Sequence, residues 1–397
     1  MSVAPLKALP DYFAYNERVE NKESSYWDYV MPFLWPCTKT LRNAFYLPLY
    51  QDKLDPSLGY DQKLAGQVVQ ALQSSNGFCS FEVALVRKYF SVRDMRVHVQ
   101  DQICYRTFTI RLFESKAPIQ GKTFRILLFC FYGNEEAPQK NVSAQKWAPL
   151  TIRDLEEGPL SVLKALQNSS VRVDSLVTTS LGNVILDAFR ASASPRAPDE
   201  LIPFSLVINR GLTSTKKVAD RLYSFPFNYF LSGAAQILGW SANPEQGLLD
   251  LLGRGSDNPK RRQVVIIEAR SDYYFSGKGG FDPNIHEKIK DRADVFRVNL
   301  YAPLVHVRAQ HSLSLDHFAC NSETQVLCNT ALFSFSEGET VPSLIAREIF
   351  HRGDENLHTC FYMAGNDATL DVATVRDVLP LLSACIEQGE KKEELAS

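Results

Sequence analysis

The 397-residue sequence contains no apolar run that approaches the length needed to span a bilayer. Its longest apolar runs, such as Ile126 to Phe131, have the length of a strand. It also has no basic stripe of the kind that binds nucleic acid, and its formal net charge is -2. We therefore expect neither a transmembrane segment nor a nucleic-acid partner.

A secretory signal and paired cysteines are missing as well. The first residues lack a charged start followed by a long apolar core, so we expect a cytoplasmic protein, or one exported by a route that needs no general signal peptide. None of the eight cysteines forms a C-x-x-C pair, and several fall inside apolar runs, where cysteine behaves as a small hydrophobe. Reduced thiols are the simplest account of this pattern.

No familiar metal or phosphate motif is present either. His306, His311 and His317 are spaced five and six residues apart, which fits no common zinc pattern. The glycine-rich segment 276–280 lacks the strand-then-helix context of a phosphate-binding loop. The sequence therefore predicts no metal site and no cofactor.

What the sequence does contain is an alternation of buried strands and helices. Apolar or alternating runs predict strands over 103–113, 123–131, 204–209, 263–269 and 295–301 and before Ser180, and a helix over 152–167. This order predicts an α/β fold with a mostly parallel sheet flanked by helices. In such a sheet the active site lies at the carboxyl ends of the strands.

We expect one domain with two extensions. Residues 1–95 are predicted to be a helical extension packed on a core of residues 96–320, and residues 321–397 a mostly helical part of the same domain. Residues 212–262 have the pattern of a helical cap, whose apolar inner wall would be formed by Phe225, Phe227, Tyr229, Phe230, Leu231, Ile237, Leu238 and Trp240. The alternative is plain packing of surface helices on the sheet.

Ser180 is the strongest candidate for chemistry. The pattern S-x-G occurs at Ser57, Ser75, Ser180 and Ser336, but only Ser180 lies between a strand pattern and a helix pattern. A sharp strand-to-helix turn there would expose the hydroxyl and would need small neighbours, as Gly182 provides. The alternative interpretation is an ordinary turn in which Ser180 caps the following helix.

The segment Thr178-Thr-Ser180-Leu-Gly182 resembles the nucleophile elbow of the α/β-hydrolase superfamily, with Thr178 where glycine is usual. The resemblance implies a catalytic order of serine, acid and histidine. Asp272 follows the strand over 263–269 and is the favoured acid, with Glu268 as the alternative. His311 is the favoured histidine, with His306 and then His317 as alternatives.

The resemblance also implies an oxyanion hole. One donor would be the N–H of Leu181, and the other would come from the loop after residue 131, from Tyr132, Gly133 or Asn134. The family usually has a helix, a strand and a helix between that loop and the elbow, whereas this sequence predicts one helix. Either a strand lies around residues 147–152 or the sheet is abbreviated.

The resulting hypothesis is a serine hydrolase of the esterase or lipase type. It would cleave an ester or thioester of an apolar or acyl substrate, either a small molecule or a lipid, through a Ser-His-Asp triad. The rival hypothesis is a catalytically inactive hydrolase-like interaction protein, such as a bacterial effector. Peripheral membrane contact and a protein partner are compatible with both hypotheses.

Overall fold

A computed structural model of the chain describes residues 9, 12–16, 86–100, 105–119, 121–130, 152–190, 203–253, 262–269, 272, 275, 277–300, 325–328, 340–350, 357–365 and 370–396. The helices of these residues include none that could span a bilayer.

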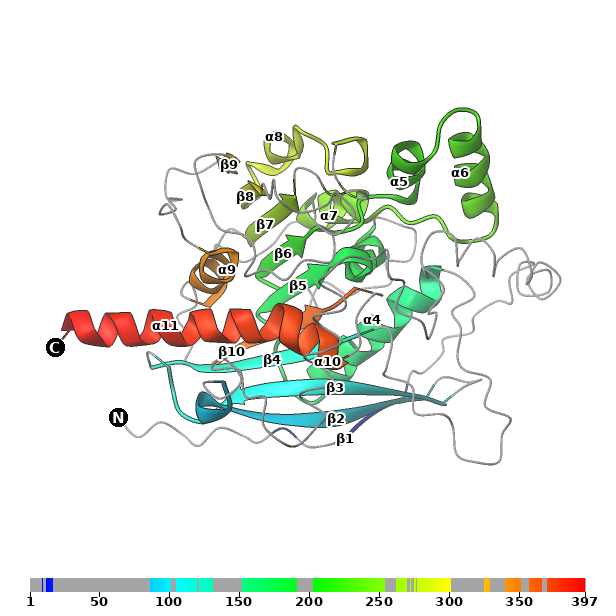
Figure 1. Cartoon of the computed structure of the whole chain (residues 1–397). Coiled ribbons are helices and arrows are strands. Elements are labelled where there is room, and N and C mark those ends of the chain that lie inside the picture. Colours follow the sequence, from blue (N-terminus) through cyan, green and yellow to red (C-terminus); the bar gives the residue numbers. More distant parts are fainter. Residues whose placement is uncertain are drawn as a thin grey trace, which may run out of the picture.

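The described strands form one ten-stranded sheet in the order β1-β2-β3-β4-β10-β5-β6-β7-β8-β9 (Figure 1). The sheet is mostly parallel, and its antiparallel pairs are β2 with β3, β3 with β4, and β8 with β9. The strands are β1 (Tyr12–Asn16), β2 (Phe90–Gln100), β3 (Tyr105–Ser115), β4 (Thr123–Phe129), β5 (Ser175–Thr179), β6 (Ser205–Asn209), β7 (Arg262–Ala269), β8 (Ala293–Leu300), β9 (Gln325–Cys328) and β10 (Leu357–Met363).

Helices and helical turns connect and cover these strands. They are α4 (Ile152–Asn168), the 3₁₀-like helix η1 (Ser180–Phe189), α5 (Thr215–Leu222), α6 (Phe227–Ile237), α7 (Pro244–Gly253), the short turn η3 (Gly277–Gly279), α8 (Ile285–Ile289), α9 (Val341–Phe350), α10 (Leu370–Ala373), the π-helical turn η6 (Thr374–Val378) and α11 (Leu379–Ala396).

Each face of the sheet carries its own apolar core, because alternate residues of a strand point to opposite faces. On β5, Leu176 belongs to the core that includes α4, η1 and α7, whereas Val177 belongs to the core that includes α9 and α11. The long helix α11 crosses the second face in Figure 1. The central strands β4 to β7 are therefore buried on both sides, which explains the long apolar runs of β4 and β7.

The structure confirms the predicted α/β class and mostly parallel sheet. The strand predicted over 263–269 is β7, and the strand predicted over 204–209 is β6. The prediction of a mostly helical C-terminal part overlooked β10, which pairs in parallel with β4 on one side and β5 on the other. β10 was overlooked because His358 and Thr359 interrupt its apolar pattern, although both are buried.

Most of the predicted N-terminal extension lies outside the described residues. Its described part includes a strand, β1, which pairs in parallel with β2. β2 itself begins at Phe90, before the predicted core boundary at residue 96. In the predicted cap, α5, α6 and α7 are helical, as expected for residues 212–262.

Candidate active site

Ser180 is the first residue after β5 and has a backbone φ of 54°. This is the left-handed region, which a non-glycine residue enters at a cost of roughly 1–2 kcal/mol. The residue before it, Thr179, has the extended conformation of a helix N-cap, with φ -124° and ψ 135°. Ser180 therefore does not occupy the N-cap position that the capping interpretation requires.

Gly182 lies against the carboxyl end of β10. A Cβ atom at residue 182 would lie 2.6 Å from the carbonyl oxygen of Met363, which is closer than any side chain tolerates. Only glycine fits at residue 182 because the end of β10 lies so close, and the predicted turn also needs a small residue there.

Thr178 does not crowd the turn, because its side chain is part of a hydrogen-bonded chain. Its Oγ1 donates to Oδ1 of Asn183 at 2.9 Å, and Nδ2 of Asn183 donates to the carbonyl oxygen of Leu212 at 2.6 Å. The N–H of Leu212 in turn donates to the carbonyl oxygen of Ser180 at 3.1 Å. Thr178 thus fastens the turn after β5 to the segment after β6.

A buried polar network occupies the other face of the same sheet edge. Thr179 Oγ1 lies 2.9 Å from the hydroxyl of Tyr362, and Asn209 Nδ2 donates to Thr179 Oγ1 at 3.5 Å. Arg210 Nε donates to Oδ1 of Asn209 at 3.1 Å. The carboxyl ends of β5, β6 and β10 are therefore joined by side chains beside Ser180.

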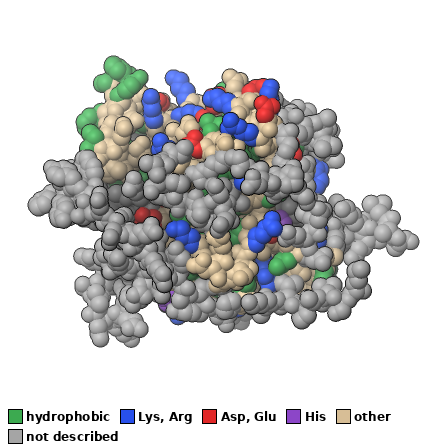
Figure 2. Space-filling view, turned by 180° about the vertical axis from the view of Figure 1, so that it is seen from behind, with side chains coloured by type: hydrophobic (Ala, Val, Ile, Leu, Met, Phe, Trp, Pro, Cys, Tyr) green, Lys and Arg blue, Asp and Glu red, His purple; other side chains and the backbone are tan. Residues whose placement is uncertain are grey.

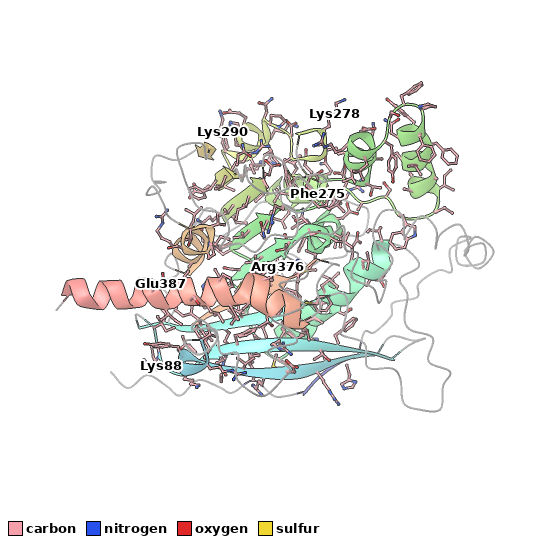
Figure 3. The ribbon with its side chains drawn as sticks, in the orientation of Figure 1. Lys88, Phe275, Lys278, Lys290, Arg376 and Glu387 are labelled. Atoms are coloured by element: carbon pink, nitrogen blue, oxygen red, sulfur yellow. The ribbon has the colours of Figure 1, made fainter. Side chains whose placement is uncertain are left out.

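This network contains buried charges of both signs. Burial lowers the pKa of Arg210, and the negative charges of Asp377 and Asp272 oppose that lowering. Arg376 forms an ion pair with Asp377 at 2.9 Å, and Figure 3 shows Arg376 near the start of α11. Burial also raises the pKa of Tyr362 well above its usual value, so its hydroxyl stays protonated at neutral pH.

Asp272 follows β7 and is buried. Its N–H donates to the carbonyl oxygen of Ala269 at 3.0 Å, and its Oδ1 accepts from the N–H of Phe275 at 3.1 Å. The Coulombic interaction between Asp272 and Arg210 brings the end of β7 into the same charged network as the end of β6.

Glu268, the alternative acid, has a different setting. It forms an ion pair with Arg297 at 2.6 Å, and its Oε1 accepts from the N–H of Phe281 at 2.9 Å. Arg297 also donates to the carbonyl oxygens of Asp282 and Pro283. The pair of Glu268 and Arg297 therefore holds the segment after η3 against β7 and β8.

The other predicted site residues lie outside the described part of the chain: Tyr132, Gly133, Asn134, His306, His311 and His317. Leu181 is described and follows Ser180 at the start of η1, with its side chain buried. The structure thus brings Ser180, Leu181, Gly182 and Asp272 to the carboxyl edge of the sheet. Among the described residues, no group of three or more potential ligands could hold a metal ion.

Sequence reasoning missed Arg210, Tyr362, Arg376 and Asp377. Arg210 directly follows the strand predicted over 204–209, and no local pattern distinguishes an arginine buried in a network from one in solvent. Tyr362 belongs to β10, whose place in the sheet depends on pairing between distant parts of the chain, and Arg376 and Asp377 belong to the helical turn η6.

The fold and this edge define an α/β protein with a strained serine and a buried charged network at the carboxyl ends of its parallel strands. Comparisons of the chain with protein-family models, with curated proteins and with solved structures found no match.

Proposed function

We propose that this protein is a serine hydrolase of the esterase or lipase type, with Ser180 as the nucleophile. The observation that carries the proposal is the backbone of Ser180. A buried strand ends, the serine adopts a φ of 54°, and a helix begins at once. Backbone strain at a single polar residue between two regular elements is typical of a functional position.

The surroundings of Ser180 support this interpretation. Gly182 faces the carbonyl oxygen of Met363, and Thr178 is tied to Asn183 rather than crowding the turn. Both contacts hold the turn in place, and a preorganised nucleophile needs such support.

Asp272 is the proposed acid, because it follows β7 and is buried at the same sheet edge. Glu268 is the weaker candidate, since its carboxylate already pairs with Arg297. The proposed histidine is His311, with His306 as the alternative. It would take the Ser180 hydroxyl proton as the oxygen attacks the carbonyl carbon, and would then protonate the leaving group. Asp272 would orient the imidazole and stabilise its charged form, and water would release the acyl group by the same route.

The oxyanion donors are proposed to be the N–H groups of Leu181 and Gly365. Met363 on β10 is paired with Thr178 on β5, and continuing this register by two residues would place Gly365 level with Ser180. The intervening N–H of Ala364 already donates to the carbonyl oxygen of Phe129 at 2.9 Å. Tyr132, Gly133 and Asn134, which follow β4 in the sequence, stay the alternative source of the second donor, and in the sheet β10 separates β4 from β5.

A fluorophosphonate probe tests the proposal, because it labels only activated serine nucleophiles. We expect the wild-type protein to be labelled, and Ser180→Ala to lose labelling and ester hydrolysis while keeping its thermal unfolding transition. Ser170→Ala is a matched control, since Ser170 also has a positive φ, of 61°, but follows α4. Absence of labelling in folded wild-type protein would reject the hydrolase and favour the inactive interaction protein.

A further inference from the structure

The segment that includes α6 exposes a cluster of large apolar side chains. Among the described residues, six large hydrophobic side chains are exposed, and five of them lie in this segment. Isolated exposed hydrophobic residues are normal on a protein surface, but a contiguous group marks an interaction site. The five residues, called here the α6 surface, are Phe225, Phe227, Tyr229, Phe230 and Ile237.

The aromatic residues of the α6 surface contact one another. The rings of Phe227 and Phe230 are stacked with centroids 6.2 Å apart, and the rings of Phe225 and Tyr229 meet edge to face at 5.8 Å. Phe225 is 79% exposed and Phe230 is 68% exposed despite these contacts. The rings therefore form one apolar surface directed away from the core. The predicted cap wall is thus divided, because Leu231, Leu238 and Trp240 are buried while these aromatic residues face outward.

The helix that carries the surface is fixed to the protein. Leu231 and Ala235 on its other side belong to the core, and Asn228 Nδ2 donates to Oδ1 of Asp220 at 2.7 Å. At the far end of the helix, the N–H of Trp240 donates to the carbonyl oxygen of Ala235 at 2.7 Å. Turning the aromatic residues inward would therefore break buried contacts.

Basic residues border the α6 surface. Lys216 and Arg221 on α5 and Lys278 on η3 are exposed, and η3 is joined to the segment before α5 by a hydrogen bond from Thr213 Oγ1 to the carbonyl oxygen of Gly279. Of the nearby acids, Glu245 pairs with Lys217 at 2.5 Å, and Asp220 accepts from the neutral amide of Asn228 and keeps its charge, so the border still carries more cations than acids. Figure 2 shows the apolar side chains beside blue Lys and Arg side chains, and Figure 3 labels Lys278.

We propose that the α6 surface and its basic border dock the protein on an anionic lipid surface. α6 has no charged residue, and a helix with exposed aromatic side chains beside cationic ones inserts its rings at the level of the headgroups. The basic border would be attracted to anionic headgroups, each Lys or Arg adding to the affinity.

A second copy of this chain fits the surface less well. A two-fold dimer through the α6 surface would bring Lys216 and Arg221 toward their own counterparts, and facing like charges disfavour association. A lipid surface supplies the opposite charge instead.

This inference concerns binding and goes beyond the proposed hydrolysis. The two are linked in space, since α5 and α6 follow β6 on the carboxyl side of the sheet, and the N–H of Leu212 bonds the carbonyl oxygen of Ser180. Docking through α6 would therefore bring the Ser180 side of the sheet toward the lipid.

Co-sedimentation with phosphatidylcholine vesicles, with and without phosphatidylserine, tests the docking. We expect wild-type protein to bind the phosphatidylserine vesicles and to bind less as the salt concentration rises. Phe225→Ser with Phe230→Ser should weaken binding about tenfold or more, because two large rings no longer insert. Lys216→Glu with Arg221→Glu should weaken it by about tenfold and remove the preference for phosphatidylserine.

Two controls are matched to these variants. Val92→Ser, on β2, removes the sixth exposed large hydrophobic side chain among the described residues, and Arg87→Glu with Lys88→Glu reverses two exposed charges beside that strand. Both should bind as wild type does. The proposal is overturned if wild-type protein does not bind phosphatidylserine vesicles at low salt. It is likewise overturned if the control variants lose as much binding as the variants of the α6 surface and its basic border. It is also overturned if light scattering shows a dimer that the Phe225 and Phe230 substitutions dissociate.

Discussion

His358 lies at the amino end of β10, away from Ser180, and its Nε2 is 2.9 Å from Oγ of Ser175. Burial lowers its pKa from 6.5 to about 4, with a smaller contribution from the charge of Lys122. The unfolded chain therefore binds a proton at His358 between pH 6.5 and about 4, where the folded protein does not. The stability that the neutral imidazole contributes is present above pH 6.5 and is lost as the pH falls toward 4.

We therefore expect the free energy of unfolding of the wild-type protein to fall by about 2 kcal/mol more between pH 7 and pH 5 than that of His358→Gln. Urea unfolding at the two pH values measures this difference. Ser175→Ala is the second variant, because it removes the hydrogen bond but keeps the burial. Ser175→Ala should lower the free energy of unfolding at both pH values but keep the wild-type difference between pH 7 and pH 5. If wild type and His358→Gln lost the same free energy of unfolding between pH 7 and pH 5, the assignment to His358 would be contradicted.

Single site residues could be predicted from the sequence where a local pattern marks them, and not where distant partners do. Ser180 could be found because a strand pattern, a turn and a helix pattern follow one another along the chain. Arg210 also has a positive φ, of 46°, and is buried, but its counter-charges Asp272 and Asp377 come from distant segments. The burial of an arginine can be predicted only when its counter-charges are known, and the sequence does not show which distant residues supply them.

Among the elements, β10 determines how the candidate site is built. It occupies the sheet position between β4 and β5, whereas the sequence analysis considered only a strand around residues 147–152 or an abbreviated sheet. Apolar strands such as β7 could be predicted because burial on both faces leaves a continuous local pattern. The neighbours of a strand are set by long-range pairing, and that information is absent from a local pattern.

The position of β10 leads to a prediction about the oxyanion hole. Gly365→Pro removes the N–H that we propose as the second oxyanion donor, and it should reduce kcat for ester hydrolysis by about 10²–10³-fold. Gly365→Ala keeps the N–H and should lose much less. Steady-state kinetics of both variants, with thermal unfolding as a check of folding, separate the loss of the donor from a change in the loop.

Gly133→Pro and Gly133→Ala are the matched pair in the loop after β4. We expect the two to differ by less than about tenfold in kcat, since Gly133 follows β4 in the sequence and β10 lies between β4 and β5 in the sheet. If kcat fell strongly only in Gly133→Pro, and Gly365→Pro were as active as Gly365→Ala, the second oxyanion donor would instead come from the segment after β4.

For the molecule as a whole, the C-terminal segment completes both the sheet and one of the two cores. β10 pairs with β4 along its whole length, and α11 contributes Leu381, Leu382 and Ile386 to the core that covers Val177 and Val265. Without this segment, β4 and β5 would each present an unpaired edge, and one face of the sheet would lose its cover.

A chain that ends at residue 356 should therefore fail to fold, whereas a chain that ends at Glu387 should fold. The longer chain keeps β10 and every buried α11 position up to Ile386, and Glu387 itself is exposed. Circular dichroism and gel filtration of the two proteins measure the difference, and we expect a cooperative thermal transition only for the longer one. If the chain ending at residue 356 unfolded cooperatively as a compact monomer, β4 and β5 would have to pair without β10. In that case the strand behind Gly182 would be dispensable, and the support that it gives to the turn at Ser180 would have to come from elsewhere.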